Sequence, residues 1–472
     1  MEQAGGIALV ALRRIQAHLH NEPTDFCAAS ELGFALKALG NQQLAARAHL
    51  HAQVMRPALR LTCGQRLIDG GSTFGRDEPN ATHLTQAAAT LRAVLSAASF
   101  SGVAAQKRLG LSVVRSPPTG DTFFSYRLKD EAVLALGRDK QPQGLLFLLF
   151  LLGRAVPSPL LEATLGMEIL HCLLSHGLLV RHTLDSTLLL APVQIYPLDL
   201  PWPSSDAGTP VTLLVATDWE VESLLPARQL VMPIGDDSLQ LALGVPSEAV
   251  AGKHVLDLCC GSGVQGLAAA LRGANTVLGV DVNPRCVRFT RFNAALNALS
   301  TGMVRAVEGS CYSPLRGDGG GPEQLFDIIL ANPPFVAVPQ IALPPCMVGD
   351  SGPALYASGG CDGTEVLQEI IGLAATALAP SGCLLCVTEL PNIRVAHHWL
   401  PMLPQPQHAL EIFIVYNPRH RQSAAQYAAY RASERAGASP YLWAAALDAA
   451  GIRDIGFGFV IARRAEGNVD ET

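Results

Sequence analysis

The sequence predicts an α/β protein whose C-terminal half folds as a Rossmann-like, doubly wound sheet and whose N-terminal half is mostly helical. The segment 253–273 has the pattern of a strand, a tight glycine turn and a helix, and 275–297 repeats the strand and the helix. Such a repeat makes a βαβ unit, the building block of a parallel sheet. Apolar runs at 326–331, 383–390 and 455–464 supply later strands, of which the last is expected to be antiparallel.

Length and composition place the chain among globular proteins of more than one domain. Its 472 residues are 49% hydrophobic and 16% charged, so roughly two to four domains with cores of their own are expected. Changes in pattern divide the chain into a helical N-terminal region at 1–120, a winged-helix-like module at 121–203, a linker with a connecting strand at 204–230, and the sheet domain at 231–472.

The module at 121–203 has the element order of a winged helix, which is three helices followed by a hairpin. A winged helix that reads DNA usually presents Arg or Lys on its recognition helix. The corresponding helix in this chain offers Glu168, His171 and His176. We therefore expect a structural or substrate-docking module, and whether it binds nucleic acid stays open.

The charge of the chain gives no overall reason to expect nucleic-acid binding, because the formal net charge is −6. The densest local cluster of cations comprises Arg419, His420, Arg421, Arg431 and Arg435. Such a cluster is suited to track phosphates, and it is equally typical of a solvated helix face.

The cysteines and the apolar segments indicate the compartment. Eleven cysteines are scattered without the spacing of a disulfide framework, which favours a reducing, cytoplasmic compartment, although an organelle transit peptide stays open. Cys383 and Cys386 form a C-x-x-C inside an apolar strand with no second pair, so no metal site is expected. The apolar segment 144–153 is too short to cross a bilayer, so we expect a buried helix and no membrane association.

The glycine turn after the first strand of the sheet indicates a nucleotide cofactor. The spacing Gly261-x-Gly263-x-x-Gly266 lets the backbone approach a ligand, and Asp281 at the end of the second strand can accept both hydroxyls of a ribose. Nicotinamide cofactors and S-adenosylmethionine both carry that ribose. Asp257 lies in the first strand, where a dinucleotide fold has little use for an acid. A carboxylate there can face a cationic amino acid moiety, which favours S-adenosylmethionine.

These motifs resemble those of the class I S-adenosylmethionine-dependent methyltransferases, and within them the methyltransferase small group, over residues 231–464. The resemblance implies a seven-stranded sheet with the cofactor at the carboxyl ends of its strands. It also implies that Asp257, Gly261 and Gly263 line the methionine end of S-adenosylmethionine and that Asp281 binds its ribose.

Two further segments belong to the same resemblance. Residues 307–315 match the loop that covers the adenine, and Ser310 stands where many relatives carry an acid. Residues 234–242 match the segment that precedes the domain in these enzymes, which implies that Asp237 and Ser238 lie near the cofactor.

The end of the strand at 326–331 is suited to hold the methyl acceptor. Asn332, Pro333, Pro334 and Phe335 follow this strand, and consecutive prolines cannot extend a sheet, so the chain leaves it in one shape. The side-chain oxygen of Asn332 and the backbone carbonyl of Pro333 can each accept one N–H of a planar NH₂ group, which orients its nitrogen without a strong base. Phe335 can stack on such an acceptor. A plain strand-ending turn is the structural alternative.

The resemblance leaves the acceptor open between two classes of molecule. Methyltransferases with this motif modify exocyclic amino groups of adenine or guanine, or the glutamine amide of translation release factors. Phenylalanine at position 335 is commoner among the RNA-modifying members, so RNA (rRNA or tRNA) is the preferred partner and protein glutamine N5-methylation is the alternative. The rival from another class is a non-catalytic binding protein that keeps the cofactor fold, which Ser310 supports.

Overall fold

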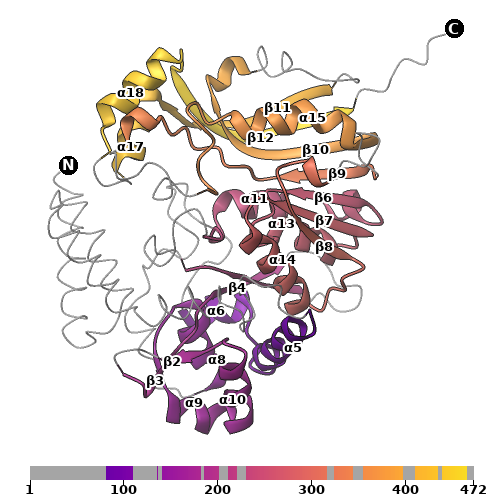
Figure 1. Ribbon diagram of the computed structural model, residues 1–472, viewed down its shortest axis with the longest axis vertical. Coiled ribbons are helices and arrows are strands. Elements are labelled where there is room, and N and C mark those ends of the chain that lie inside the picture. The colour runs from indigo at the N-terminus through magenta and orange to yellow at the C-terminus, as the bar shows by residue number, and fades with distance from the viewer. Residues whose placement is uncertain are drawn as a thin grey trace. The chain divides into compact units, whose positions relative to one another are not determined.

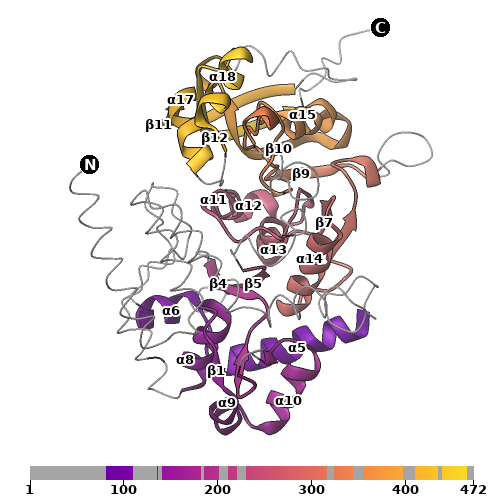
Figure 2. The same cartoon turned by 60° about the vertical axis from the view of Figure 1, so that its left-hand side comes forward.

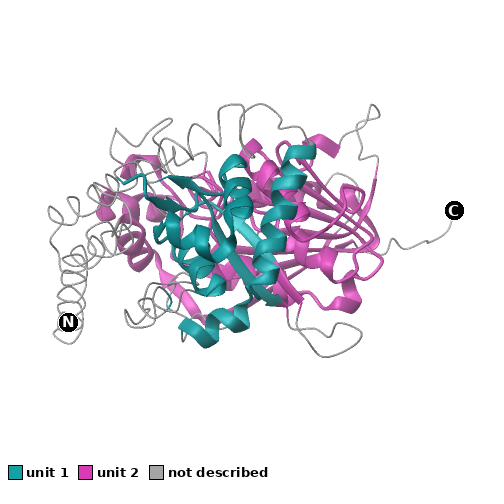
Figure 3. Ribbon diagram, turned by 90° about the horizontal axis from the view of Figure 1, so that it is seen from below, with its two compact units in different colours: residues 1–199, 214–225 teal, residues 200–213, 226–472 magenta. Residues whose placement is uncertain are grey.

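The computed structural model divides into two compact units (Figure 3), residues 1–199 with 214–225 and residues 200–213 with 226–472. The residues that it describes are 81–109, 136, 141–181, 185–200, 211–219, 230–315, 324–343, 355–396, 410–433 and 438–464. Most of the predicted helical region at 1–120 therefore lies outside the described residues. The domain boundaries predicted from the sequence stay predictions.

The described helices of the first unit bury apolar faces, as their sequences predict. They are α5 (Ala81–Ala97), α6 (Gly102–Leu109) and α8 (Pro142–Leu146), and α8 continues as the π-helical turn η2 (Phe147–Leu151). All five side chains of η2 are buried, which confirms the buried helix expected for this apolar segment. Among the described helices none alone is long and apolar enough to span a membrane, and only α5 and α6 together, bent by 50°, reach that length.

The first unit also contains the elements on which the winged-helix prediction was based. Helices α9 (Ser158–Leu165) and α10 (Met167–Ser175) follow strand β1 (Val156–Pro157) and precede β2 (Val180–Arg181) and β3 (Leu188–Leu190). The three short strands form an antiparallel sheet in the order β1-β3-β2. This order is compatible with a winged helix, and the assignment stays a prediction.

A separate two-stranded sheet follows along the chain. It pairs β4 (Gln194–Leu200) with β5 (Val211–Thr217). Strand β5 falls within the range 204–230, where the sequence predicts a connecting strand.

The second unit contains a seven-stranded sheet in the order β11-β12-β10-β9-β6-β7-β8 (Figure 1), which confirms the predicted Rossmann-like sheet. Neighbouring strands from β10 to β8 are parallel, whereas β12 is antiparallel to both of its neighbours, as predicted for the last strand. The strands are β6 (His254–Leu258), β7 (Thr276–Asp281), β8 (Val304–Glu308), β9 (Phe326–Ala331), β10 (Leu378–Pro391), β11 (Leu410–Ser423) and β12 (Asp454–Arg464).

Helices cover both faces of this sheet, which makes it doubly wound. Helix α15 (Glu365–Ala377) packs on the face that carries Leu256, Leu258 and Ile329, where the main core lies. Parallel strands buried on both faces need such continuous apolar runs. The opposite face carries neighbouring helices (Figure 2), which are α11 (Asp236–Gly244), α12 (Ser247–Val250), α13 (Val264–Leu271) and α14 (Pro284–Leu296).

A pair of helices is inserted between the last two strands of the chain. Helices α17 (Ala424–Ser433) and α18 (Pro440–Ala449) pack on the chain that leaves β9, including the short helix η5 (Gln340–Ala342). Two other single-turn helices, η4 (Ser313–Leu315) and η8 (Ile393–Val395), follow β8 and β10.

Candidate active site

A pocket of about 250 Å³ lies at the carboxyl ends of β6, β7 and β9. The strand order reverses beside β6, and ligands of open α/β sheets bind at such a reversal. The pocket is the meeting point of residues that lie far apart in the sequence. Of the predicted site residues it is lined by Ser238, Gly261, Asp281, Ser310, Asn332 and Pro334.

The glycine turn between β6 and α13 forms one wall of this pocket. Gly261 and Gly263 have φ values of 56° and 82°, which favour glycine. A Cβ added at Gly261 would meet open space, whereas one at Gly263 would lie 2.8 Å from Cγ2 of Thr290. Gly261 thus exposes its backbone to a ligand, and Gly263 allows α14 to approach the turn.

Asp281 ties the end of β7 to the glycine turn. Its Oδ2 accepts the Gly261 N–H at 2.9 Å, and its Oδ1 accepts the Asn283 N–H at 2.9 Å. Burial raises the pKa of Asp281, and the two backbone N–H donors lower it. A carboxylate has about four acceptor sites, more than these donors use, so the side chain is suited to accept a hydroxyl of a ribose in the pocket.

Asp257 lies beneath the glycine turn and does not line the pocket. It is 1% exposed, and its Oδ2 accepts the Gly266 N–H at 3.0 Å. Its Oδ1 is buried without a hydrogen-bond partner among the described residues. Burial raises the pKa of Asp257 to about 7. Because a buried acceptor without a partner is costly, the ionised form of Asp257 is destabilised at this place, in line with its raised pKa.

Ser310 lies at the exposed rim of the pocket. Its N–H donates to Oγ of Ser313 at 3.1 Å, and the Ser313 N–H donates back to the Ser310 carbonyl at 2.8 Å. Asp281 is the one carboxylate among the residues that line the pocket. The adenine contact of Ser310 stays a prediction.

Asn332 is held in one orientation by the start of α11. Its Nδ2 donates to Oδ2 of Asp237 at 3.0 Å and to Oγ of Ser238 at 3.2 Å. Both N–H bonds of the amide are therefore used, and Oδ1 is left as its acceptor. Burial raises the pKa of Asp237, while the hydrogen bond from Asn332 lowers it. Ser238 lines the pocket as expected, but Asp237 does not; it contacts Asn332, a partnership that sequence reasoning missed.

The chain after Asn332 is fixed by a neighbouring segment. The Val336 N–H donates to the Ala357 carbonyl at 2.9 Å, and the Gly359 N–H donates to the Val336 carbonyl at 3.0 Å. A Cβ at Gly359 would lie 2.7 Å from the Pro334 carbonyl oxygen, so only glycine allows this approach. The exit from β9 is thus closely packed.

Phe335 and Pro333 lie away from the pocket lining. The ring of Phe335 is half-buried and meets that of Phe457 edge to face, with centroids 6.2 Å apart. Pro333 is buried. The predicted stacking of Phe335 on an acceptor, like the other roles assigned to the site residues, stays a prediction.

Two residues of α14 support the glycine turn and were missed in the sequence. Oγ1 of Thr290 donates to the Gly261 carbonyl at 3.2 Å, and Nδ2 of Asn293 donates to the Ser262 carbonyl at 2.9 Å. Both side chains are buried. The available signal was a pair of polar residues three positions apart, which places them on the same face of the helix.

Two of the five cations of the cluster that includes Arg419 form ion pairs with acids of this chain. Arg421 pairs with Asp454 at 3.3 Å, and Arg431 pairs with Glu389 at 2.7 Å. Arg435 lies outside the described residues. The two internal pairs remove charge from the surface that the sequence suggested for phosphates.

Comparison with known proteins finds methyltransferases. The family model described as ribosomal protein L11 methyltransferase (PrmA) matches residues 241–345. The ribosomal protein uL3 glutamine methyltransferase of Burkholderia pseudomallei is 32% identical over 175 residues, which are 37% of this chain and 55% of that protein. The release factor glutamine methyltransferase of Deinococcus radiodurans is 36% identical over 142 residues, or 29% of this chain and 46% of that protein.

The comparison with solved structures also gives a match. The crystal structure of ribosomal protein L11 methylase from Lactobacillus delbrueckii subsp. bulgaricus matches 49% of this chain and 81% of that chain, with a TM-score of 0.27 and 20% identity. The chain spans about half the length of the two curated relatives described above.

These matches confirm the resemblance to the class I S-adenosylmethionine-dependent methyltransferases. The pocket fits that cofactor, since the Gly261 backbone is open to it and Asp281 stands in its lining at the end of β7. The predicted RNA substrate is wrong, because these relatives are named as methyltransferases of a ribosomal protein and of release factors.

Proposed function

We propose that this chain is an S-adenosylmethionine-dependent N-methyltransferase that modifies the side-chain amide of a glutamine in a protein of the translation apparatus. The observation that carries the proposal is the oriented amide of Asn332, whose two N–H bonds are held by Asp237 and Ser238 beside the pocket. The relatives named for glutamine methylation of uL3 and of release factors support the choice of acceptor.

The two acceptors that follow β9 match the two N–H bonds of a primary amide. In the proposed complex Oδ1 of Asn332 accepts one N–H, and the Pro333 carbonyl, which lies outside the pocket lining before the acceptor binds, accepts the other. The two bonds fix the plane of the amide and the direction of its nitrogen. An amide nitrogen is a poor nucleophile because its electron pair is delocalised. Orientation and polarisation by fixed acceptors are therefore the contributions that this site makes.

The cofactor half of the pocket supplies binding and orientation. S-adenosylmethionine, when bound, provides an electrophilic methyl carbon on a sulfonium centre. Asp281 accepts ribose hydroxyls, the charge of Asp257 attracts the ammonium group from beneath the glycine turn, and the open backbone at Gly261 allows close approach. The amide nitrogen, once methylated, would give one proton to water, so no strong base is required of the residues around the pocket.

Labelling of a cell extract tests the acceptor. An extract from a strain that lacks this chain is incubated with the purified protein and tritiated S-adenosylmethionine, and is then treated with RNase or with protease. We expect the label to survive RNase, to disappear with protease, and to map by mass spectrometry to a glutamine. A label that RNase removes contradicts the proposal.

A variant of Asn332 tests the mechanism in the same assay. Asn332→Ala removes one of the two acceptors, so kcat should fall on the order of 100- to 1000-fold. The affinity for S-adenosylhomocysteine, measured by calorimetry, should stay within about twofold of the wild-type affinity, since residues other than Asn332 hold the cofactor. Unchanged turnover would show that Asn332 does not polarise the acceptor.

A further inference from the structure

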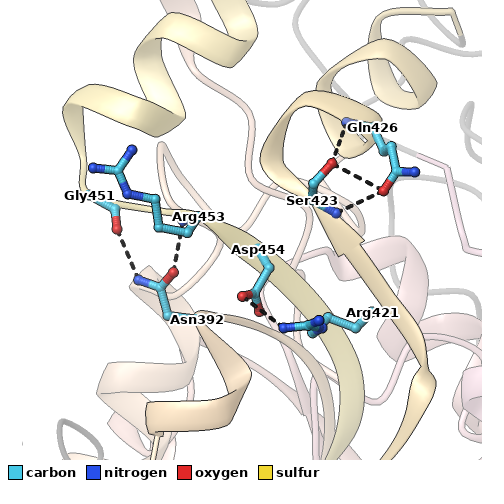
Figure 4. Close-up of polar contacts among 7 residues, drawn as sticks. All are labelled: Asn392, Arg421, Ser423, Gln426, Gly451, Arg453 and Asp454. Atoms are coloured by element: carbon cyan, nitrogen blue, oxygen red, sulfur yellow. Dashed lines mark hydrogen bonds and ion pairs between the residues drawn. The ribbon is translucent and has the colours of Figure 1, made fainter.

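The helical insertion between β11 and β12 is anchored to the sheet at both of its ends. Figure 4 shows the polar contacts at these ends. They connect Ser423 with Gln426, Arg421 with Asp454, and Asn392 with both Gly451 and Arg453. At the first end the Ser423 N–H and Oγ donate to Oε1 of Gln426, each at 3.0 Å. At the second end Asn392 accepts the Arg453 N–H at 2.8 Å and donates to the Gly451 carbonyl at 3.0 Å. The insertion therefore starts and ends at fixed points.

A buried polar network connects this insertion to the strand beside the acceptor site. The hydroxyl of Tyr427 in α17 donates to Oε2 of Glu389 in β10 at 2.7 Å. Arg431, one turn further along α17, pairs with Oε1 of the same carboxylate at 2.7 Å. Tyr427 is 2% exposed, and the side chains of Glu389 and Arg431 are each 15% exposed. The contacts are thus largely shielded from water, which strengthens them.

The same hydroxyl holds the backbone that follows the acceptor motif. The Ala337 N–H donates to Oη of Tyr427 at 3.1 Å, and Ala337 is two residues beyond Phe335. The neighbouring Val338 N–H donates to the Gly360 carbonyl at 2.8 Å. Phe335 itself packs against the apolar cluster that contains Tyr427. The chain after Phe335 is therefore held by the segment at 357–360 and by the insertion.

We propose that Tyr427, Glu389 and Arg431 form a positioning network, which fixes the chain after Phe335 and thereby the place of the segment Asn332–Pro334, whose two ends line the pocket. The inference rests on the proposed function, and it adds residues that do not line the pocket. The carboxylate of Glu389 fixes the hydroxyl, since an ionised acid only accepts hydrogen bonds. The lone pairs of Tyr427 are then directed at the Ala337 N–H. Arg431 holds the carboxylate in place.

Tyr427→Phe in the full chain is the first test, because it removes one oxygen atom and keeps the ring in the apolar cluster. Hydrogen exchange of the Ala337 amide should accelerate on the order of tenfold, as expected for the loss of one hydrogen bond. With uL3 and release factor from a strain that lacks this chain as the methylation substrates, kcat should fall about 10- to 100-fold. The affinity for S-adenosylhomocysteine should not change.

Tyr441→Phe is the matched control, since it makes the same chemical change on α18 at a side chain that is 86% exposed. It should leave exchange, kcat and cofactor affinity as in the wild type. Equal exchange and equal kcat in Tyr427→Phe and Tyr441→Phe would overturn the proposal. A fall in cofactor affinity equal to the fall in kcat would also overturn it, because it would indicate a general structural role.

Charge variants keep the test decisive if Tyr427→Phe does not fold. Glu389→Gln should accelerate the exchange of the Ala337 amide and lower kcat, whereas Arg431→Lys, which keeps the charge, should retain most of both wild-type values. Equal behaviour of the two variants contradicts the network. If the wild type methylates neither protein, the proposed function fails, while the exchange measurements still decide whether the network positions this chain.

Discussion

At the scale of a single residue, Asp257 links the fold to the cofactor. One of its oxygens holds α13 and the other is buried without a partner among the described residues. Because burial raises its pKa to about 7, part of the carboxyl is protonated at neutral pH and carries no charge that attracts a cation in the pocket above the turn. We expect the affinity for S-adenosylhomocysteine to weaken as the pH falls through about 7, by at most about tenfold for each pH unit, as measured by calorimetry.

Asp257→Asn is the variant that isolates this titration, since it keeps the shape and cannot ionise. Its affinity should be weak and nearly constant between about pH 5 and 8, and a wild-type affinity that is equally constant would refute the prediction.

The ionisation of Asp257 affects the stability of the fold in the opposite direction to cofactor affinity. The pKa is raised from an ordinary value of 3.8, so this stabilising contribution is present in acid and is lost as the pH rises through about 7.

Asp237 has a different role, because it determines whether the oxygen or the nitrogen of the Asn332 amide faces the acceptor. An asparagine at position 237 offers N–H bonds as well as an oxygen, so the amide of Asn332 can turn over and present the wrong group. In Asp237→Asn we expect kcat to fall about 10- to 100-fold, with cofactor affinity within about twofold. Asp236→Asn, at the adjacent position, is the control. A loss of cofactor binding equal to the loss of turnover speaks against this orienting role.

At the scale of the elements, the glycine turn sets how closely α14 approaches β6. Gly261→Ala and Gly263→Ala should each cost about 1–2 kcal/mol through the left-handed backbone. Gly263→Ala should cost more, because its Cβ would lie 2.8 Å from Cγ2 of Thr290. Thr290→Ser, which removes that methyl group and keeps the hydroxyl, should recover part of the extra cost. Urea unfolding of the two single variants and the double variant measures this, and equal stabilities of both glycine variants contradict it.

The elements of the sheet were predictable because each has a local signal in the sequence. The βαβ unit is marked by apolar runs around the turn at Gly261, and the last strand by its own apolar run. The contacts that complete the site have no such signal. Asp237 meets Asn332 across 95 positions and Tyr427 meets Ala337 across 90, and pairs so far apart leave no periodic pattern.

The substrate class was predicted wrongly because Phe335 was interpreted through its frequency among relatives. In the structure this ring packs against Phe457 and the apolar cluster of the helical insertion, and it does not line the pocket. The identity of an aromatic residue in such a place depends on packing as well as on the acceptor. It is therefore weak evidence on which molecule is methylated.

At the scale of the whole molecule, all residues that line the pocket belong to the second unit. They lie between Leu230 and Val366, and this unit contains the continuous range 226–472. We expect a chain of residues 226–472 to bind S-adenosylhomocysteine with the affinity of the full protein, as measured by calorimetry. A truncated chain that has native far-UV circular dichroism but no affinity would show that the first unit contributes to the site.

The proline after Asn332 has a consequence for the chemical durability of the protein. Asparagine deamidates mainly when the backbone N–H of the next residue attacks its side chain and forms a cyclic imide. Proline has no N–H, so this route is closed at Asn332. The amide on which the proposed reaction depends is therefore protected from the commonest form of ageing of asparagine.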